Sequence, residues 1–176
     1  IENAIRRVKR HPYLIGKRFG TVGVKINQKL VEITTFRSEK YEDGNRKPKD
    51  EFVKDITADL SRRDFTVNAM AFRDGRLIDP FGGKEDLDRK IIKCVGLPGD
   101  RFREDPLRML RVARFASQLN FTIDENIEKT VLNMNYKILE ISRERWVMEM
   151  DKLLMIDTPR VGLEFLARTR LLNFMF

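Results

Sequence analysis

The stretch from Glu104 to Phe115 places the tightest limit on how this chain can fold. A helix turns by about 100° per residue, and the apolar residues of this stretch then leave no wide polar face. These apolar residues are Leu107, Met109, Leu110, Val112, Ala113 and Phe115. A helix that is apolar on all sides is packed on several sides. The sequence therefore predicts a helix over residues 104–118 that is surrounded by other elements, so its arginines are not a freely solvated stripe.

Before this helix, the apolar residues of the sequence recur with a different period, that of a β-strand. Apolar residues alternate with others at Val22, Val24 and Ile26, and a second strand-like run covers 30–36, which predicts a β-hairpin. A second hairpin is predicted at 68–72 and 76–79, closed by Asp74-Gly75. Short helices are predicted at 2–10, at the end of 54–61 and at 85–89, with a strand at 90–95. The polar stretch 37–50 is predicted to be a flexible loop.

After Asp100 the pattern predicts helices only, at 104–118, 124–133, 142–156 and 160–168. The predicted fold class is therefore α+β, with a mixed β-sheet in the first part and an all-α part after it. We predict a partial first domain at 1–99, a helical region at 100–157, and the start of another helical region at 158–176.

The charge balance is basic, with a formal net charge of +8 and a pI near 9.7. Such a balance favours an anionic partner such as nucleic acid or nucleotide phosphates, although many soluble proteins are equally basic without one. Cys94 is the only cysteine, which excludes an internal disulfide and fits a reducing, cytoplasmic compartment. No apolar run approaches the length needed to span a bilayer, so no membrane partner is predicted.

Three charged residues share one side of the predicted helix at 104–118. Asp105, Arg108 and Arg111 follow one another by about 60° of rotation, and Arg114 continues the drift. Pro106 fits the first helical turn, with Asp105 as the N-cap. One interpretation is that Asp105 only caps the helix and that the arginines pair with acids elsewhere. The other interpretation is that the cluster recognises a nucleotide base and its phosphates.

Base recognition by such a cluster has a specific chemical basis. Cytosine and adenine both present an amino donor beside a ring-nitrogen acceptor, and the Asp105 carboxylate beside the Arg108 guanidinium matches that pattern. Uracil and guanine present the reverse pattern, so like groups would oppose each other. A site of this kind would accept C and A and reject U and G, because a mismatched base leaves polar groups unpaired.

A second charged cluster, Arg62-Arg63-Asp64, precedes the apolar residue Phe65. Guanidinium groups suit phosphate oxygens, and Asp64 or Asn68 could bond ribose hydroxyls. A surface ion-pair cluster is an equally good explanation of these residues from spacing alone.

These segments resemble the signatures of a known family. Residues 63–69 (RDFTVNA), 79–83 (DPFGG) and 104–115 (EDPLRMLRVARF) look like motifs of the class II tRNA nucleotidyltransferases. That family includes CCA-adding enzymes, their CC-adding and A-adding relatives, and bacterial poly(A) polymerases. The three motifs occur in the family's order, and the resemblance runs from about Phe19 to Phe121.

The resemblance implies a nucleotidyltransferase head followed by a helical neck and the start of a helical body. It also implies template-independent addition of C and/or A to the 3′ end of tRNA, with CTP and ATP as substrates. A bacterial poly(A) polymerase acting on mRNA is an alternative, because it shares the motifs. A non-catalytic nucleotide-binding or RNA-binding subunit is an alternative of another class.

The resemblance further implies nucleotide-binding roles for Arg63, Asp64, Asn68, Asp105, Arg108, Arg111 and Arg114. Arg63 would contact the incoming nucleotide, with Asp64 and Asn68 near its ribose. Asp105 and Arg108 would read the base, while Arg111 and Arg114 would support the base and the triphosphate. The implied hinge between head and neck contains Asp79, Gly82 and Gly83, and the polar stretch 37–50 matches a loop that helps the change from C to A.

The family's catalytic metal site is only partly matched. Glu32 corresponds to a third, catalytic acidic residue, but no Asp-x-Asp strand preceded by a glycine pair occurs before Phe19. The resemblance therefore implies that Mg²⁺ is held mainly by residues absent from this chain, which other segments or other chains would supply. We expect the chain alone to have little or no transferase activity.

Overall fold

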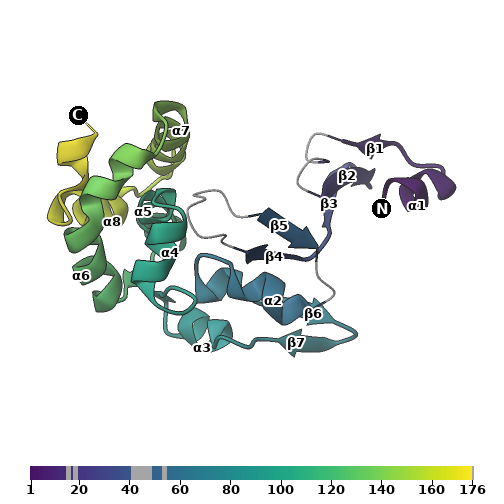
Figure 1. The fold of residues 1–176 in the computed structure, drawn as a ribbon, viewed down its shortest axis with the longest axis horizontal. Helices are drawn as coiled ribbons and strands as arrows, with labels where there is room; N and C mark the ends of the chain where they lie inside the picture. The colour runs from purple at the N-terminus through teal and green to yellow at the C-terminus, as the bar shows by residue number, and fades with distance from the viewer. Residues whose placement is uncertain (15–16, 18–19, 41–48, 53–54, 176) are drawn as a thin grey trace. The chain divides into compact units, whose positions relative to one another are not determined.

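The computed structural model describes residues 1–14, 17, 20–40, 49–52 and 55–175, and it divides into two compact units. The first unit is Ile1–Asp59 and the second is Leu60–Phe176. Helices and short strands occur in both units (Figure 1), so the predicted α+β fold class is confirmed. The contact-based division falls at Asp59 and Leu60, whereas the sequence predicts the end of the head at residue 99; that predicted boundary stays a prediction.

The first unit is built on a tight hairpin. Its two-residue turn, Asn27-Gln28, has positive φ angles of 47° and 65°, which match the right-handed twist of the flanking strands. The predicted first hairpin is therefore confirmed, and the predicted first helix ends three residues early, at Arg7. The elements are α1 (Glu2–Arg7) and a three-stranded antiparallel sheet of β1 (Pro12–Tyr13), β2 (Thr21–Ile26) and β3 (Lys29–Thr34), in that order.

The prediction of a loop over 37–50 is wrong at both ends of the stretch. Strand β4 (Arg37–Lys40) pairs antiparallel with β5 (Lys49–Phe52), and residues 41–48 lie outside the described residues. Main-chain pairing between two strands does not require apolar side chains, which is why the polar composition hid them. Helix α2 (Ile56–Ser61) follows, as predicted for the end of 54–61.

The second unit begins with short elements that carry the second predicted hairpin. Its turn, Asp74-Gly75, has φ angles of 50° and 77°, and the hairpin is confirmed. The elements are the 3₁₀ turn η2 (Thr66–Asn68), β6 (Ala71–Arg73), β7 (Arg76–Ile78), α3 (Gly83–Asp88) and β8 (Ile91–Ile92).

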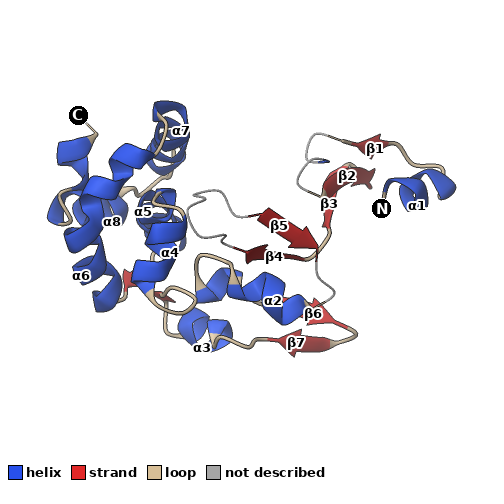
Figure 2. Cartoon of the chain, in the orientation of Figure 1, coloured by secondary structure: helices blue, strands red, loops and turns tan. Residues whose placement is uncertain are grey.

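The rest of the second unit is mostly helical, as Figure 2 shows in blue. The four predicted helices are present as α5, α6, α7 and α8; the first three have shifted ends, α8 has the predicted bounds, and one unpredicted helix, α4, precedes them. The expectation of helices alone is wrong at β9, which pairs in parallel with β8. The elements are α4 (Pro98–Glu104), α5 (Leu107–Leu119), β9 (Thr122–Ile123), α6 (Glu125–Met134), η3 (Asn135–Glu140), α7 (Arg143–Leu154), α8 (Arg160–Arg168) and η4 (Leu171–Phe174).

Helix α5 is the centre of the core of the second unit. Met109, Val112 and Ala113 have no exposed surface, so the predicted packing of this helix on several sides is confirmed. Helix α8 approaches α5 closely at Gly162, where a Cβ atom would lie 2.4 Å from the Ala113 carbonyl oxygen. The backbone N–H of Gly162 donates to Ser117 Oγ at 2.8 Å across the same contact. Packing from several sides therefore fixes the helix that carries the candidate site residues.

Among the described residues, no helix combines the length and apolar character that crossing a membrane requires.

Candidate functional site

A cleft of about 530 Å³ lies in the second unit, and most of its lining is charged. Its lining residues come from residues 62–68, which end in η2, from Asp105 and α5, and from α7. The lining residues are Arg62, Arg63, Asp64, Asn68, Asp105, Leu107, Arg108, Arg111, Phe115 and Arg145. Six of the seven predicted nucleotide-binding residues therefore lie on one cleft, although two separate segments of sequence supply them.

Asp105 has an extended backbone conformation and lies between α4 and α5. The structure assigns the N-cap of α5 to Pro106 rather than to Asp105, which corrects the predicted cap by one residue. The Asp105 carboxylate still serves the helix start, because Oδ1 accepts a hydrogen bond from the backbone N–H of Leu107 at 3.2 Å. Its other oxygen, Oδ2, accepts from the Arg145 guanidinium at 2.9 Å. The side chain remains one-third exposed at the cleft.

Arg108 is held by three acceptors and is mostly buried. Its guanidinium donates to the backbone carbonyls of Arg62 at 2.8 Å and Arg101 at 3.3 Å, and to Glu104 Oε2 at 2.5 Å. Glu104 also accepts from Arg101, so this carboxylate joins the two guanidiniums. An arginine has five N–H groups. Three of them are used by these bonds among the described residues, which leaves capacity to donate to a ligand.

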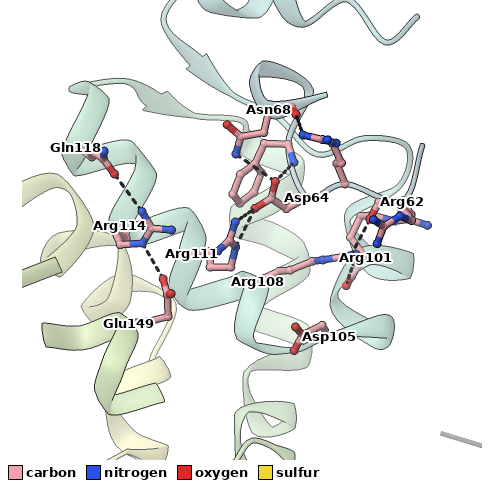
Figure 3. A network of polar contacts seen from close by, with 12 residues as sticks. Arg62, Asp64, Asn68, Arg101, Asp105, Arg108, Arg111, Arg114, Gln118 and Glu149 are labelled. Atoms are coloured by element: carbon pink, nitrogen blue, oxygen red, sulfur yellow. Dashed lines mark hydrogen bonds and ion pairs between the residues drawn. The ribbon is translucent and has the colours of Figure 1, made fainter. Parts of the chain in front are cut away.

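Arg111 and Asp64 form the central ion pair of the cleft (Figure 3). Both Nε and one terminal nitrogen of Arg111 donate to Asp64 Oδ2, at 2.8 and 2.5 Å. Asp64 Oδ1 accepts from the Phe65 backbone N–H at 2.8 Å and from Asn68 Nδ2 at 3.1 Å. A carboxylate offers about four lone-pair sites, so these bonds occupy the acceptor capacity of Asp64.

Arg63, which precedes Asp64, also lines the cleft. Its guanidinium donates to the Asn68 carbonyl oxygen at 2.9 Å, which folds the side chain back over the η2 turn. Asn68 is thus in contact with Asp64 through its amide and with Arg63 through its carbonyl group. These two bonds hold residues 63–68 together, and the Asp64–Arg111 pair joins this segment to α5.

Arg114 is the one predicted nucleotide-binding residue that does not line this cleft. Figure 3 shows its guanidinium turned toward Gln118 and Glu149. Its Nε donates to Glu149 Oε2 at 2.7 Å, and the Glu149 side chain is only 5% exposed. Burial alone would raise the pKa of Glu149, but hydrogen bonds from Arg114 and Lys152 outweigh it and hold that pKa below its usual value. Arg114 therefore anchors α7 to α5 in this structure.

The predicted hinge residues form a well-bonded turn. Asp79 accepts from the backbone N–H groups of Gly83 at 2.7 Å and Lys84 at 2.8 Å, which satisfies the start of α3. Gly82 has a φ of 73°, and Gly83 packs so closely that a Cβ atom would lie 2.2 Å from the Thr66 carbonyl oxygen. The turn is therefore attached to η2 beside the cleft, and its role as a hinge stays a prediction.

Glu32, the predicted catalytic residue, belongs to the first unit. It lies on β3 opposite Gly23, and its side chain is exposed. Among the described residues, no group of three or more His, Cys, Asp or Glu could hold a metal ion. One Asp-x-Asp spacing does occur, at Asp86 and Asp88, but it lies in α3. There Asp86 accepts from Thr66 and Asp88 pairs with Lys84, so the two carboxylates do not converge.

Sequence reasoning missed three residues of the cleft, Leu107, Phe115 and Arg145, and one residue that supports it, Glu104. The helical pattern predicts Phe115 as a core residue, yet it also lines the cleft beside Arg111, whose guanidinium carbon lies 5.2 Å from the ring centroid. Arg145 is separated from Asp105 by forty positions, so no local period could connect them. Glu104 could have been found from its spacing, because it precedes Arg108 by four residues, which is one turn of the helix predicted over 104–118.

Two family models match this chain; the motifs at 63–69 and 79–83 lie within the first match, and the motif at 104–115 lies between the two matches. The family described as "Poly A polymerase head domain" matches residues 1–93. A second family, described as "Probable RNA and SrmB- binding site of polymerase A", matches residues 120–176. Together they cover the first unit, the arginine-rich segment of the cleft and the helices that follow α5.

Individual proteins similar to this chain are CCA-adding enzymes and tRNA nucleotidyltransferases. The CCA-adding enzyme of Bacillus subtilis is 44% identical over 159 residues, which are 89% of this chain and 40% of that protein. The structure of the Bacillus stearothermophilus CCA-adding enzyme in complex with CTP matches with a TM-score of 0.82 and 41% identity, over 92% of this chain and 39% of that one. A tRNA nucleotidyltransferase complexed with a primer tRNA and an incoming ATP analog matches with a TM-score of 0.80 and 34% identity, over 99% of this chain and 49% of that one. The chain spans about 40% of the length of the curated relatives it matches.

Proposed function

This chain belongs to the poly(A) polymerase head-domain family, and on that premise we propose that it is the nucleotide-selecting portion of an RNA nucleotidyltransferase. The proposed reaction of the whole protein is addition of C and/or A to the 3′ end of tRNA, with CTP and ATP as substrates. The names of its relatives support this reaction, because several are CCA-adding enzymes and one is a tRNA nucleotidyltransferase complexed with a primer tRNA. A cytoplasmic location fits this role and the single reduced cysteine.

The observation that carries the proposal is the meeting of Asp105 and Arg108 at one cleft. Each Asp105 oxygen accepts one hydrogen bond from the described residues, so each can accept a further hydrogen bond from an amino group. Arg108 has N–H groups left for a ring nitrogen. Cytosine and adenine satisfy both groups, whereas uracil and guanine oppose a carbonyl to the carboxylate and an N–H to the guanidinium. The cleft would therefore select C and A without a nucleic-acid template.

The remaining residues of the cleft support the triphosphate and the sugar in this proposal. Arg63 lines the cleft, and its guanidinium group suits phosphate oxygens. Because the acceptor sites of Asp64 are occupied, we propose that Asp64 orients Arg111 and Asn68 rather than bonding the ribose itself. Asn68 Oδ1 then becomes the group offered to a ribose hydroxyl.

The transfer step needs more than the described residues provide. The family reaction is attack of the RNA 3′ hydroxyl on the α-phosphate with release of pyrophosphate, for which Mg²⁺ supplies charge stabilisation when it is bound. The described residues do not fit a complete metal site, so no step of the transfer is assigned to them. We propose only that Glu32 contributes one carboxylate when further acidic groups are present.

Equilibrium binding tests the proposal directly. We expect isothermal titration of this chain to give tighter binding for CTP and ATP than for UTP and GTP. Asp105→Ala should reduce this preference, and a CTP preference that survives the substitution would remove Asp105 from base selection. Equal affinity of the unchanged chain for all four nucleotides would contradict the proposed function. In the full-length protein, product analysis with CTP and ATP offered separately distinguishes CCA addition from poly(A) synthesis.

A further inference from the structure

Arg145 reaches the proposed base-reading carboxylate from a helix that contributes no other residue to the cleft lining. It lies near the start of α7, and one of its terminal nitrogens donates to Asp105 Oδ2 at 2.9 Å. On the other side of the same carboxylate, Oδ1 accepts from the Leu107 backbone N–H at 3.2 Å. The two oxygens of Asp105 are thus held from two different elements.

The position of Arg145 is set by a buried ion pair one helical turn away. Glu149 follows Arg145 by four residues on α7, so both side chains project from the same face. Glu149 is buried against α5, where it accepts from Arg114 at 2.7 Å, and Lys152 donates to its other oxygen at 3.0 Å. This anchor holds α7 against the helix that begins beside Asp105, which brings the half-exposed Arg145 to the cleft.

We propose that Arg145 is a positioning residue that determines base specificity by fixing the orientation of the Asp105 carboxylate. The proposal rests on the proposed function, because it concerns the same base-reading group. The terminal torsion of an aspartate is broad, so one backbone hydrogen bond leaves the carboxylate plane free to turn. A second bond, from Arg145 to the opposite oxygen, restricts that rotation and directs the unused lone pairs into the cleft.

A fixed carboxylate matters most for rejection of the wrong base. When uracil or guanine places a carbonyl oxygen against Asp105, a mobile carboxylate can turn aside and avoid the repulsion. A fixed carboxylate cannot turn aside, so the mismatch keeps its full cost. Loss of Arg145 should therefore weaken binding of CTP and ATP while leaving UTP and GTP unchanged or slightly tighter. A residue that only attracts phosphates would weaken binding of all four nucleotides together.

The test uses this chain and three variants. Arg145→Met removes the guanidinium but keeps an apolar stem of similar reach, and Arg145→Lys restores one charged donor. Arg143→Met is the matched control, because Arg143 lies on the same helix, is exposed and does not line the cleft. Thermal unfolding checks that every variant is folded, and isothermal titration with CTP, ATP, UTP and GTP gives the preference for C and A over U and G.

We expect Arg145→Met to lower the preference for CTP over UTP by roughly 3- to 10-fold, the range of one net hydrogen bond. Arg145→Lys should recover part of the loss, and Arg143→Met should keep the original preference. An unchanged ratio in Arg145→Met, together with a lowered ratio in Asp105→Ala, would overturn the role of Arg145 and leave the proposed function intact. An equal loss for all four nucleotides would also overturn it. Absence of any preference in the unchanged chain would instead contradict the proposed function.

Discussion

The contact between α5 and α8 gives a sharp prediction for the variant Gly162→Ala. The added Cβ atom would lie 2.4 Å from the Ala113 carbonyl oxygen and 2.8 Å from Ser117 Oγ. Because the first of these atoms belongs to the backbone of α5, relief requires α8 to move by roughly 1 Å to reach ordinary van der Waals separation. That movement also stretches the 2.8 Å hydrogen bond from Gly162 N–H to Ser117 Oγ.

The expected cost follows from three terms. Overpacking of a core costs about 1–3 kcal/mol. Weakening of one hydrogen bond adds about 0.5–1.5 kcal/mol. The better helix propensity of alanine returns about 1 kcal/mol. We therefore expect Gly162→Ala to lower the free energy of unfolding of the second unit by about 2 kcal/mol, with a fall in Tm of roughly 4–8 °C.

Unfolding followed by the fluorescence of the single tryptophan measures this effect. Trp146 lies on α7, so its signal reports on the second unit. Gly99→Ala is the matched control: Gly99 is also helical, but a Cβ atom there would come no closer than 3.4 Å to the end of the flexible Arg103 side chain. The control should be neutral or slightly stabilised. If Gly162→Ala behaved like Gly99→Ala, the close approach of α8 to α5 would be contradicted.

Four further predictions concern other parts of the second unit. Glu149→Gln should lower the free energy of unfolding by about 3 kcal/mol at neutral pH, because it unpairs Arg114. The folded-state pKa of Glu149 is lowered, so in urea unfolding the difference between the variant and the unchanged chain should shrink as pH falls below about 4. A difference that stays constant with pH would contradict this prediction. Burial raises the pKa of the Cys94 thiol to about 12, so its alkylation at pH 8 should be slow until the chain is unfolded; rapid alkylation of the folded chain would contradict this burial. Phe165→Ala should cost roughly 3–5 kcal/mol in thermal unfolding, since the ring has no exposed surface, and a loss below 1 kcal/mol would exclude the packing described. Arg63→Ala should weaken nucleotide binding in titration whichever base is offered, and unchanged affinity for all four would remove its proposed phosphate role.

Local periodicity was sufficient to predict the helical side of the cleft. Arg108 and Arg111 lie on one side of α5 because the turn per residue is fixed, and the structure brings both of them to one cleft with Asp105, which lies in extended backbone just before the helix. Helical periodicity could not predict that the Arg114 side chain points away from the cleft. Its guanidinium follows Glu149, a partner that only the packing of α7 on α5 reveals.

Sequence patterns could not predict contacts between segments that are far apart in the chain. The pairs Asp64–Arg111 and Asp105–Arg145 join residues more than thirty positions apart, and their formation depends on how the helices pack. Helix α4 was hidden for a different reason: Pro98 and Gly99 predict a turn, yet proline is also favoured at the first position of a helix. The two-residue strands β8 and β9 are too short for any alternation to appear.

The distance from a bound base to the start of α5 tests the central claim most directly. We predict that a crystal structure of this chain with CTP places the cytosine amino group within hydrogen-bond distance of an Asp105 oxygen. The ring nitrogen N3 of the same base should lie within reach of an Arg108 N–H. A cytosine that binds elsewhere, with Asp105 still bonded only to Leu107 and Arg145, would contradict base selection by this cleft.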